Sequence, residues 1–218
     1  MSNALEGRCR VVGRKEGEPV REGDLRIWRH FDAALSLRIL ELDGETAIHN
    51  PKHDEVLYVL EGNGTVDGTP VGPDTGIYVP PGHHLQLNGA MTLASSLCRA
   101  KRSDRPSAII RLNDQEARTT GDRSYRELIQ GEVTQFVGSI PPGRAPEHFH
   151  LYEEVICILD GTGMAWFGAS STPIAAGSCI LLPRKQFHCL ENTGQGELRL
   201  LGTFYPAGSP AVRYSAEK

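Results

Sequence analysis

Long apolar runs, an excess of basic residues and paired cysteines are all missing from this sequence. No stretch of its 218 residues approaches the length of about 20 apolar residues that a membrane-spanning helix needs. The formal net charge is -4 with no basic stripe, so nucleic acid is not an expected partner. The N-terminal residues lack the apolar core of a signal peptide. We therefore expect a cytoplasmic protein that binds neither membranes nor nucleic acid.

The five cysteines form no Cys-x-x-Cys pair, which argues against a cysteine-based metal site. We expect them to be reduced, small and apolar in role. Cys157 and Cys189 have the opposite strand parity to the potential metal ligands described below, so we expect them on the outer faces of their strands.

Amphipathic helices are scarce, whereas the chain has 24 glycines and 14 prolines. Many short apolar runs separated by turn residues predict an all-β sandwich or barrel. The predicted strands lie near residues 25–42, 56–60, 65–71, 76–80, 84–97, 133–140, 155–159, 163–167, 178–182 and 198–204. Polar, broken sequence places a boundary within 100–130, where Ser124 to Leu128 is a candidate short helix.

One segment concentrates potential metal ligands, namely His148, His150, Glu154 and His188. Side chains alternate between faces in an extended chain, so positions 148, 150 and 154 share one face. A neighbouring antiparallel strand would return His188 to the same end. Such fixed nitrogen and oxygen donors suit a divalent transition metal ion. A lone histidine is more often a surface or hydrogen-bonded residue, but three histidines beside a carboxylate favour the metal interpretation.

The spacing around these ligands resembles that of the cupin family. Residues 143–161 follow its first motif, Gly, His-x-His, Glu, Gly, with one residue fewer before His148. Residues 177–192 follow the second, Gly, Pro-x-Gly, His, Asn, except that Lys185 stands where the family usually has glycine. Because a lysine avoids the left-handed turn that glycine tolerates, we expect an altered loop before His188. The resemblance implies a jelly-roll barrel, also called a double-stranded β-helix, with the four residues as metal ligands.

The first half of the chain contains a second, weaker copy of the pattern. A shift of 99 residues superimposes His49, Glu55, Gly62 and Gly64 on His148, Glu154, Gly161 and Gly163. Similarity to the cupins therefore implies a bicupin with two tandem barrels. We place an N-terminal barrel with a degenerate motif at residues 1–110 and a C-terminal barrel with an intact motif at residues 111–218.

The first copy departs from the motif at its ligand positions. Pro51 replaces the second histidine, Leu85 the fourth ligand, and Gly89 the asparagine. The simplest interpretation is a barrel that kept its fold and lost its metal. The alternative is an irregular second site built from His49, His53, Glu55 and His83.

The predicted ligands leave part of the coordination sphere of a six-coordinate ion open. Such an ion would polarise a bound oxygen and lower its pKa. Iron(II) or manganese(II) suits this donor set best, with zinc, nickel and copper as alternatives. The family contains several reactions on one fold, so fold is a weak guide to chemistry. Our leading hypothesis is a metal-dependent dioxygenase-type oxidoreductase acting on a small oxygen-rich or aromatic metabolite.

Two alternatives stay open at this point. One is a non-enzymatic bicupin that binds a small carboxylate or sugar, and the other is a metal-dependent decarboxylase or isomerase, which would need a separate acid or base. Proximity to the motifs nominates four pocket residues, Arg144, Tyr152, Trp166 and Gln186. The expected partner is a small-molecule ligand or substrate, and the protein is expected to be a monomer or homodimer.

Overall fold

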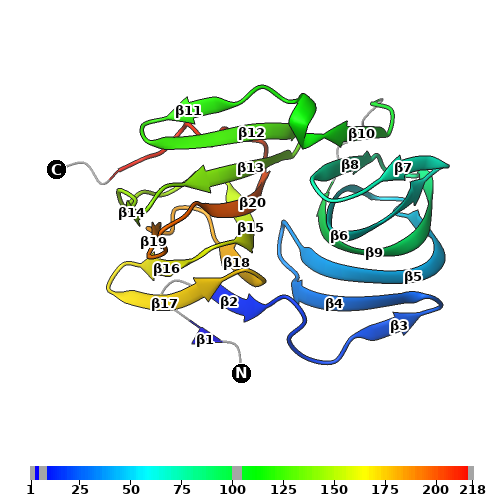
Figure 1. Ribbon diagram of the computed structural model, residues 1–218, viewed down its shortest axis with the longest axis horizontal. Helices are drawn as coiled ribbons and strands as arrows, with labels where there is room; N and C mark the ends of the chain where they lie inside the picture. The colour runs from blue at the N-terminus through cyan, green and yellow to red at the C-terminus, as the bar shows by residue number, and fades with distance from the viewer. Residues whose placement is uncertain (1–2, 5–8, 100–104, 216–218) are drawn as a thin grey trace. The chain divides into compact units, whose positions relative to one another are not determined.

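The computed structural model describes residues 3–4, 9–99 and 105–215, and over them the protein is all-β (Figure 1). Apart from a 3-10 turn at Leu112–Asp114, the regular structure of these residues consists of strands. Within the described residues, no helix is long and apolar enough to cross a membrane.

The chain divides into two compact units. The N-terminal unit is Lys15–Gln115, and the C-terminal unit combines Met1–Arg14 with Glu116–Lys218. We expected the N-terminal unit to be residues 1–110. In the structure it ends at Gln115, and the segment before Lys15 belongs to the C-terminal unit instead. The strand β2 (Arg10–Gly13) pairs with β18 (Ser178–Leu182), so the first residues complete the sheet of the C-terminal unit.

One sheet forms the N-terminal unit, with the strand order β10-β8-β6-β9-β5-β4-β3 and β7 paired to β6. Its strands are β3 (Val20–Glu22), β4 (Leu25–Phe31), β5 (Leu37–His49), β6 (His53–Val66), β7 (Thr69–Val71), β8 (Thr75–Val79), β9 (His84–Arg99) and β10 (Ala108–Arg111). All of β8 and residues 54–59 of β6 are buried on both faces. Aliphatic side chains of these strands pack into one core cluster that includes Leu40, Leu57, Ile77 and Leu93.

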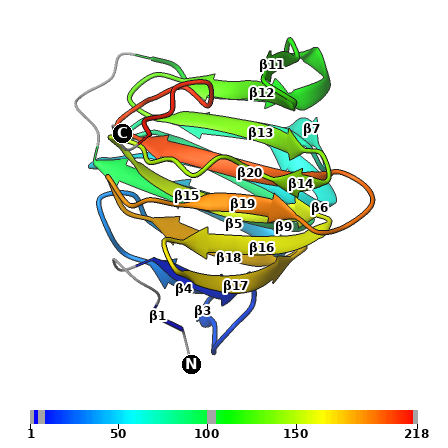
Figure 2. The same cartoon turned by 90° about the vertical axis from the view of Figure 1, so that its left-hand side faces the viewer.

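Two sheets form the C-terminal unit. The larger has the order β1-β2-β18-β15-β20-β13-β12-β11 and the smaller β14-β19-β16-β17. Figure 2 shows the smaller sheet in front of the larger one. The remaining strands are β1 (Asn3–Ala4), β11 (Arg118–Thr120), β12 (Arg123–Gln130), β13 (Thr134–Ile140), β14 (Gly143–Arg144), β15 (Glu153–Asp160), β16 (Thr162–Phe167), β17 (Ser170–Ala175), β19 (Cys189–Asn192) and β20 (Leu198–Tyr205).

The candidate helix at Ser124 to Leu128 was wrong, because these residues belong to β12. Their backbone groups pair with β13 along most of its length, and this pairing overrides a modest local preference for helix. The predicted strand at 25–42 is in fact two strands, β4 and β5, joined by a short connection.

Strand register supports the internal repeat. Glu55 on β6 lies opposite Val79, the residue before Pro80, and Glu154 on β15 lies opposite Leu182, the residue before Pro183. Gly62 follows Glu55 at the same spacing as Gly161 follows Glu154. The backbone conformations of these two glycines also correspond, because both have positive φ, at 80° and 89°. The two glutamates therefore occupy corresponding positions in the two units.

Candidate metal centre

Backbone pairing brings two of the predicted ligands together. His148 and His188 form an isolated bridge in which each backbone N–H donates to the other residue's carbonyl, at 3.0 and 2.9 Å. Their rings lie 4.5 Å apart between centroids. The bridge fixes these two imidazoles side by side although 40 residues separate them in sequence.

The other two ligands approach from the start of β15. Glu154 Oε2 lies 3.5 Å from His150 Nε2 and 3.9 Å from His188 Nε2. Nitrogen atoms of His148, His150 and His188 all lie within 4.8 Å of one another. The structure therefore brings together the four residues that the sequence motif nominated. Glu154, His150 and His188 are buried, and His148 is partly exposed.

Backbone carbonyls orient two of the rings. His148 Nδ1 lies 3.0 Å from the Pro146 carbonyl, and His188 Nδ1 lies 2.9 Å from the Gln186 carbonyl. A ring that donates through Nδ1 presents an unprotonated Nε2, which is the form that binds a metal. This arrangement preselects the binding tautomer before any ion arrives.

Burial keeps these imidazoles neutral. It lowers the pKa of His148 to about 4 and the pKa values of His150 and His188 to about 3. The same burial raises the pKa of Glu154 to about 8. Neutral imidazoles are ready to bind a cation, whereas the carboxylate lacks a compensating positive charge from its immediate partners.

The residues present fit a divalent ion. Donor atoms bound to one ion at about 2.0–2.2 Å can be no more than about 4.4 Å apart. The distances from Glu154 to His150 and His188 satisfy this limit, and the three histidine nitrogens, within 4.8 Å of one another, would move slightly closer together on binding one ion. A cation among the four donors would supply the positive charge that buried Glu154 lacks. The donor set of three nitrogens and one oxygen suits iron(II), manganese(II) and other divalent transition metals.

The four residues line a pocket that lies within the C-terminal unit, with a volume of about 80 Å³. Because a single water needs about 10–15 Å³, this space admits a ligand of only a few heavy atoms. One wall is apolar and includes Phe136, Ile156 and Phe204. Glu154 is the one acidic residue among the described residues that line the pocket.

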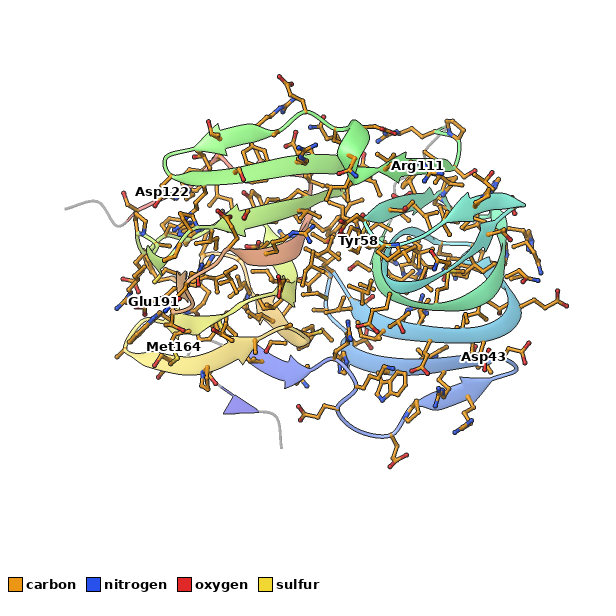
Figure 3. The ribbon with its side chains drawn as sticks, viewed as in Figure 1. Asp43, Tyr58, Arg111, Asp122, Met164 and Glu191 are labelled. Atoms are coloured by element: carbon orange, nitrogen blue, oxygen red, sulfur yellow. The ribbon has the colours of Figure 1, made fainter. Side chains whose placement is uncertain are left out.

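The four nominated pocket residues lie outside this lining. The Arg144 guanidinium stacks on the Trp166 ring at 3.9 Å and its Nε lies 3.4 Å from Cys189 Sγ. Trp166 Nε1 donates to Glu191, which is labelled in Figure 3, at 2.8 Å. Arg144 and Trp166 therefore form a cluster on the smaller sheet, away from the ligands' pocket.

Tyr152 and Gln186 contact the candidate ligands but do not line the pocket. The Tyr152 ring stacks on His150 with centroids 4.8 Å apart, and its hydroxyl donates to the Ser209 carbonyl at 2.9 Å. Gln186 contributes the backbone carbonyl that faces His188 Nδ1. Both residues support the site without lining the pocket.

The alternative second site does not assemble. His49, His53, Glu55 and His83 form no group of converging ligand atoms. Glu55 is fully buried, and Arg38 Nη2 and Ser95 Oγ donate to it at 2.6 and 2.5 Å, while Asn50 donates to its other oxygen. Glu55, which corresponds to Glu154, is therefore paired with an arginine of its own unit, Arg38.

The expected avoidance of a left-handed turn at Lys185 was wrong. Lys185 has φ of 63°, and its backbone N–H donates to the His150 carbonyl at 2.7 Å. This hydrogen bond lies between two metal-ligand segments and offsets the strain of a side chain in the left-handed region. The motif position keeps its turn geometry without glycine.

The cysteines are free and buried. Cys157 and Cys189 lie outside the pocket lining. Cys157 instead faces Cys179 on the neighbouring strand, with 3.7 Å between the sulfur atoms.

Sequence reasoning missed two arginines, Arg123 and Arg213, that line the pocket. Arg123 begins β12, in the region where the sequence predicts a domain boundary and a short helix. Arg213 follows the last strand, in a segment whose Tyr214 pairs with Phe149 between two ligands. Their local sequence carries no motif, so only the long-range pairing reveals them.

Residues 136–204 match the cupin domain family, and this segment contains all four candidate ligands. No curated protein matches the sequence. Solved structures with the same fold cover nearly the whole chain at low identity.

One similar structure is a glyoxylate-induced protein from Pseudomonas aeruginosa, at 15% identity and a TM-score of 0.79, covering 100% of this chain and 95% of that one. Protein Ylba from E. coli has 11% identity and a TM-score of 0.78, with 94% and 93% coverage. Oxalate decarboxylase from Bacillus subtilis, described with Mn(II) centres, has 13% identity and a TM-score of 0.75, with 94% and 79% coverage. At these identities the likeness establishes the fold.

Proposed function

We propose that the C-terminal unit is a metal-dependent cupin enzyme site that acts on a small metabolite. The observation that carries the proposal is the convergence of His148, His150, Glu154 and His188 on one small pocket. Three neutral imidazoles and one buried carboxylate are the donors that hold iron(II) or manganese(II) with positions left open. When bound, the ion would act as a Lewis acid and lower the pKa of a substrate oxygen.

We further propose that both units are cupin barrels, so that the chain is a bicupin with one working centre. The corresponding register of Glu55 and Glu154 supports a repeat, as does fold similarity over the full chain. The engagement of Glu55 by Arg38 supports a first unit that kept its fold without a metal.

The pocket chemistry favours a dioxygenase-type reaction over proton-transfer chemistry. Apart from the ligand Glu154, the described lining residues include no Asp, Glu or Lys that would serve as a second acid or base. A decarboxylase or isomerase would have to use a hydroxyl such as that of Tyr125. Oxidation at an ion with open positions needs fewer proton-transfer groups from the protein.

The chain's own residues have separate roles in this proposal. Pro146 and Gln186 carbonyls hold the protons of His148 and His188 at Nδ1. Phe136 and Phe204 exclude water from the inner wall of the pocket. The substrate would therefore bind in a small space with apolar side chains next to the donors.

Metal analysis of the purified protein tests the site. The wild-type protein should hold about one equivalent of a divalent metal, and His148→Ala or His188→Ala should lose it while the protein stays folded. His49→Ala is the matched control. It should keep the metal, because Arg38 already pairs with Glu55 in the N-terminal unit and the proposed metal lies in the C-terminal unit. Unchanged metal content in both ligand variants would show that the assignment is wrong.

Oxygen uptake then separates the functional classes. The metal-loaded protein should consume oxygen with small phenols, diketones or hydroxy acids, and the His188→Ala protein should not. Binding of these compounds without any turnover would favour the non-enzymatic alternative, and anaerobic release of carbon dioxide would favour a decarboxylase.

A further inference from the structure

Two guanidinium groups line the pocket that contains the metal ligands, and the described residues around them do not neutralise both. Arg123 and Arg213 are the basic side chains of the lining, and Glu154 is its single acidic side chain. If Glu154 neutralises part of the charge of a bound ion, the arginines keep their own positive charge. The pocket is then suited to an anion.

Arg123 is held in the pocket with an incomplete set of partners. Its side chain is 13% exposed, and its Nε atom is buried without a hydrogen-bond acceptor among the described residues. The nearest carboxylate is that of Asp122 in the preceding turn, labelled in Figure 3, which lies 3.9 Å away and is 78% exposed. A buried donor of this kind normally has a partner, so a ligand oxygen is a natural one.

Arg213 is fixed by the segment that follows β20. Its Nη2 donates to Thr120 Oγ1 at 2.8 Å and weakly to the Thr120 carbonyl at 3.4 Å. Paired backbone hydrogen bonds between Phe149 and Tyr214 hold the adjacent backbone, and the Tyr152 hydroxyl donates to the Ser209 and Val212 carbonyls. These ties place the arginine beside the ligand segment at His148–His150.

Arg213 acts on Arg123, and both arginines act on His148. Burial lowers the pKa of Arg123, and the positive charge of Arg213 lowers it further. Burial is the main cause that lowers the pKa of His148, and the hydrogen bond to the Pro146 carbonyl raises it. The positive charges of both arginines lower it further. Two like charges in the lining of one small pocket repel each other, and an anion between them offsets that repulsion.

We propose that Arg123 and Arg213 form a carboxylate-binding subsite of this pocket, so that the substrate is a small 2-hydroxy or 2-oxo acid. This inference rests on the proposed metal site, because the second oxygen of such an acid would face the ion. Guanidinium groups bind carboxylates through paired, charge-assisted hydrogen bonds. The volume of about 80 Å³ limits the acid to a few heavy atoms.

Calorimetric titration of the metal-loaded protein with glycolate, lactate and 2-oxobutyrate, each beside its amide, tests the subsite. The acids should bind about 10-fold or more tighter than the amides, which lack the charge. Arg123→Met and Arg213→Met should each weaken acid binding about 10-fold to 100-fold and leave amide binding unchanged. Arg123→Lys and Arg213→Lys should show smaller losses, because they keep the charge without the paired donors.

Arg144→Met is the matched control, since Arg144 belongs to the same unit but lies outside the pocket lining. It should leave acid binding unchanged. Equal binding of acids and amides, or full acid affinity in both Arg123→Met and Arg213→Met, would overturn the subsite.

Metal content is measured in every variant, so that failure of the subsite and failure of the metal site are distinguished. The arginine variants should keep the metal of the wild-type protein. If the wild-type protein holds no metal, the proposed function fails, and the preference for acids over amides is then scored on the metal-free protein. There the two arginines should still favour the acids, and absence of that preference would overturn the subsite as well.

Discussion

Two buried glutamates at corresponding positions have opposite electrostatic surroundings. Glu55 in the N-terminal unit accepts hydrogen bonds from Arg38, Ser95 and Asn50. Glu154 in the C-terminal unit faces neutral imidazoles of His150 and His188 instead. A buried carboxylate needs a cation. The N-terminal unit supplies its own in Arg38, whereas under the proposed function the C-terminal unit would take one from solution.

Strand register shows how the internal cation was placed. Arg38 lies opposite Ser95, two residues before Leu97, which pairs with Glu55. In the C-terminal unit, Phe136 lies opposite Gly202, two residues before Phe204, which pairs with Glu154.

Phe136 and Gly202 therefore occupy the positions of Arg38 and Ser95. A Cβ on Gly202 would meet the Phe136 ring at 2.3 Å, so the phenyl ring fills that space against the bare glycine. An apolar pair stands where the other unit has its cation and hydroxyl, and this leaves Glu154 for a metal.

Removal of the internal cation should give the largest effect. Arg38→Met leaves Glu55 buried and unpaired, which should lower the free energy of unfolding by about 3–5 kcal/mol. The chain has two tryptophans, Trp28 and Trp166, one in each unit. In a Trp166→Phe background, Trp28 fluorescence during urea denaturation reports the N-terminal unit alone.

Two controls accompany this measurement. Adding Glu55→Leu to Arg38→Met should restore part of the lost stability, since no unpaired charge is then buried. Metal content should stay at the wild-type level, because Arg38 belongs to the other unit. A loss below about 1 kcal/mol would mean that the pair does not neutralise Glu55 as described.

The second prediction compares the two glutamates directly, in metal-free protein. Burial raises the folded-state pKa of Glu154 from 4.5 to about 8. Because the folded protein holds this proton more tightly than the unfolded chain, the proton contributes to stability. The contribution is complete below the unfolded-state pKa and is lost as pH rises through about 8. Between pH 7 and 9, the metal-free wild-type protein should therefore lose about 1–2 kcal/mol of stability.

Glu154→Gln should remove the Glu154 part of that decline in the C-terminal unit, followed by Trp166 in a Trp28→Phe background. Buried cysteines, whose unfolded-state pKa is about 8.5, contribute equally in both proteins, so the difference between wild type and Glu154→Gln is the quantity measured. The range above pH 7 avoids titration of the histidines, whose unfolded-state pKa values are near 6.5. Glu55→Gln is the matched comparison, and it should destabilise the N-terminal unit because Arg38 loses its counter-charge. If both substitutions lower stability equally at pH 9, the two carboxylates do not differ as proposed.

The parts of the site that were predictable from sequence are those encoded locally. His148, His150 and Glu154 lie close together in sequence, and the glycines and Pro183 mark the turns that frame them, so spacing alone nominated them. Arg38, Arg123 and Arg213 reach their glutamate or pocket only through strand pairing between distant segments. Proximity in sequence was a poor guide for Arg144 and Trp166, because they lie on the smaller sheet.

The all-β fold was predictable for a similar reason. Alternating apolar runs identify strands, whereas the order of strands in a sheet depends on contacts that sequence spacing does not show. The pairing of β2 with β18 is such a contact. Residues 124–128 contain helix-compatible side chains, and their pairing with β13 on one side and β11 on the other makes them a strand.

The smallest expected difference between the units concerns the turn after Pro80 and Pro183, which occupy corresponding positions in the repeat. Gly82 and Lys185 occupy the same place in this turn, with φ of 76° and 63°. Each donates its backbone N–H to the segment before the glutamate strand, to Asn50 at 2.8 Å and to His150 at 2.7 Å. The turn is thus preserved, and only the side chain differs.

Lys185→Gly should stabilise the C-terminal unit by about 0.5–1 kcal/mol, because relief of left-handed strain exceeds the entropy that glycine adds to the unfolded chain. Gly82→Lys should destabilise the N-terminal unit by about 1 kcal/mol, since a Cβ there meets nothing within 4 Å and only backbone strain acts. Urea denaturation followed by Trp166 and Trp28 measures the two effects separately. Metal content should not change in either variant, and a destabilising Lys185→Gly would mean that the lysine side chain itself contributes to the loop before His188.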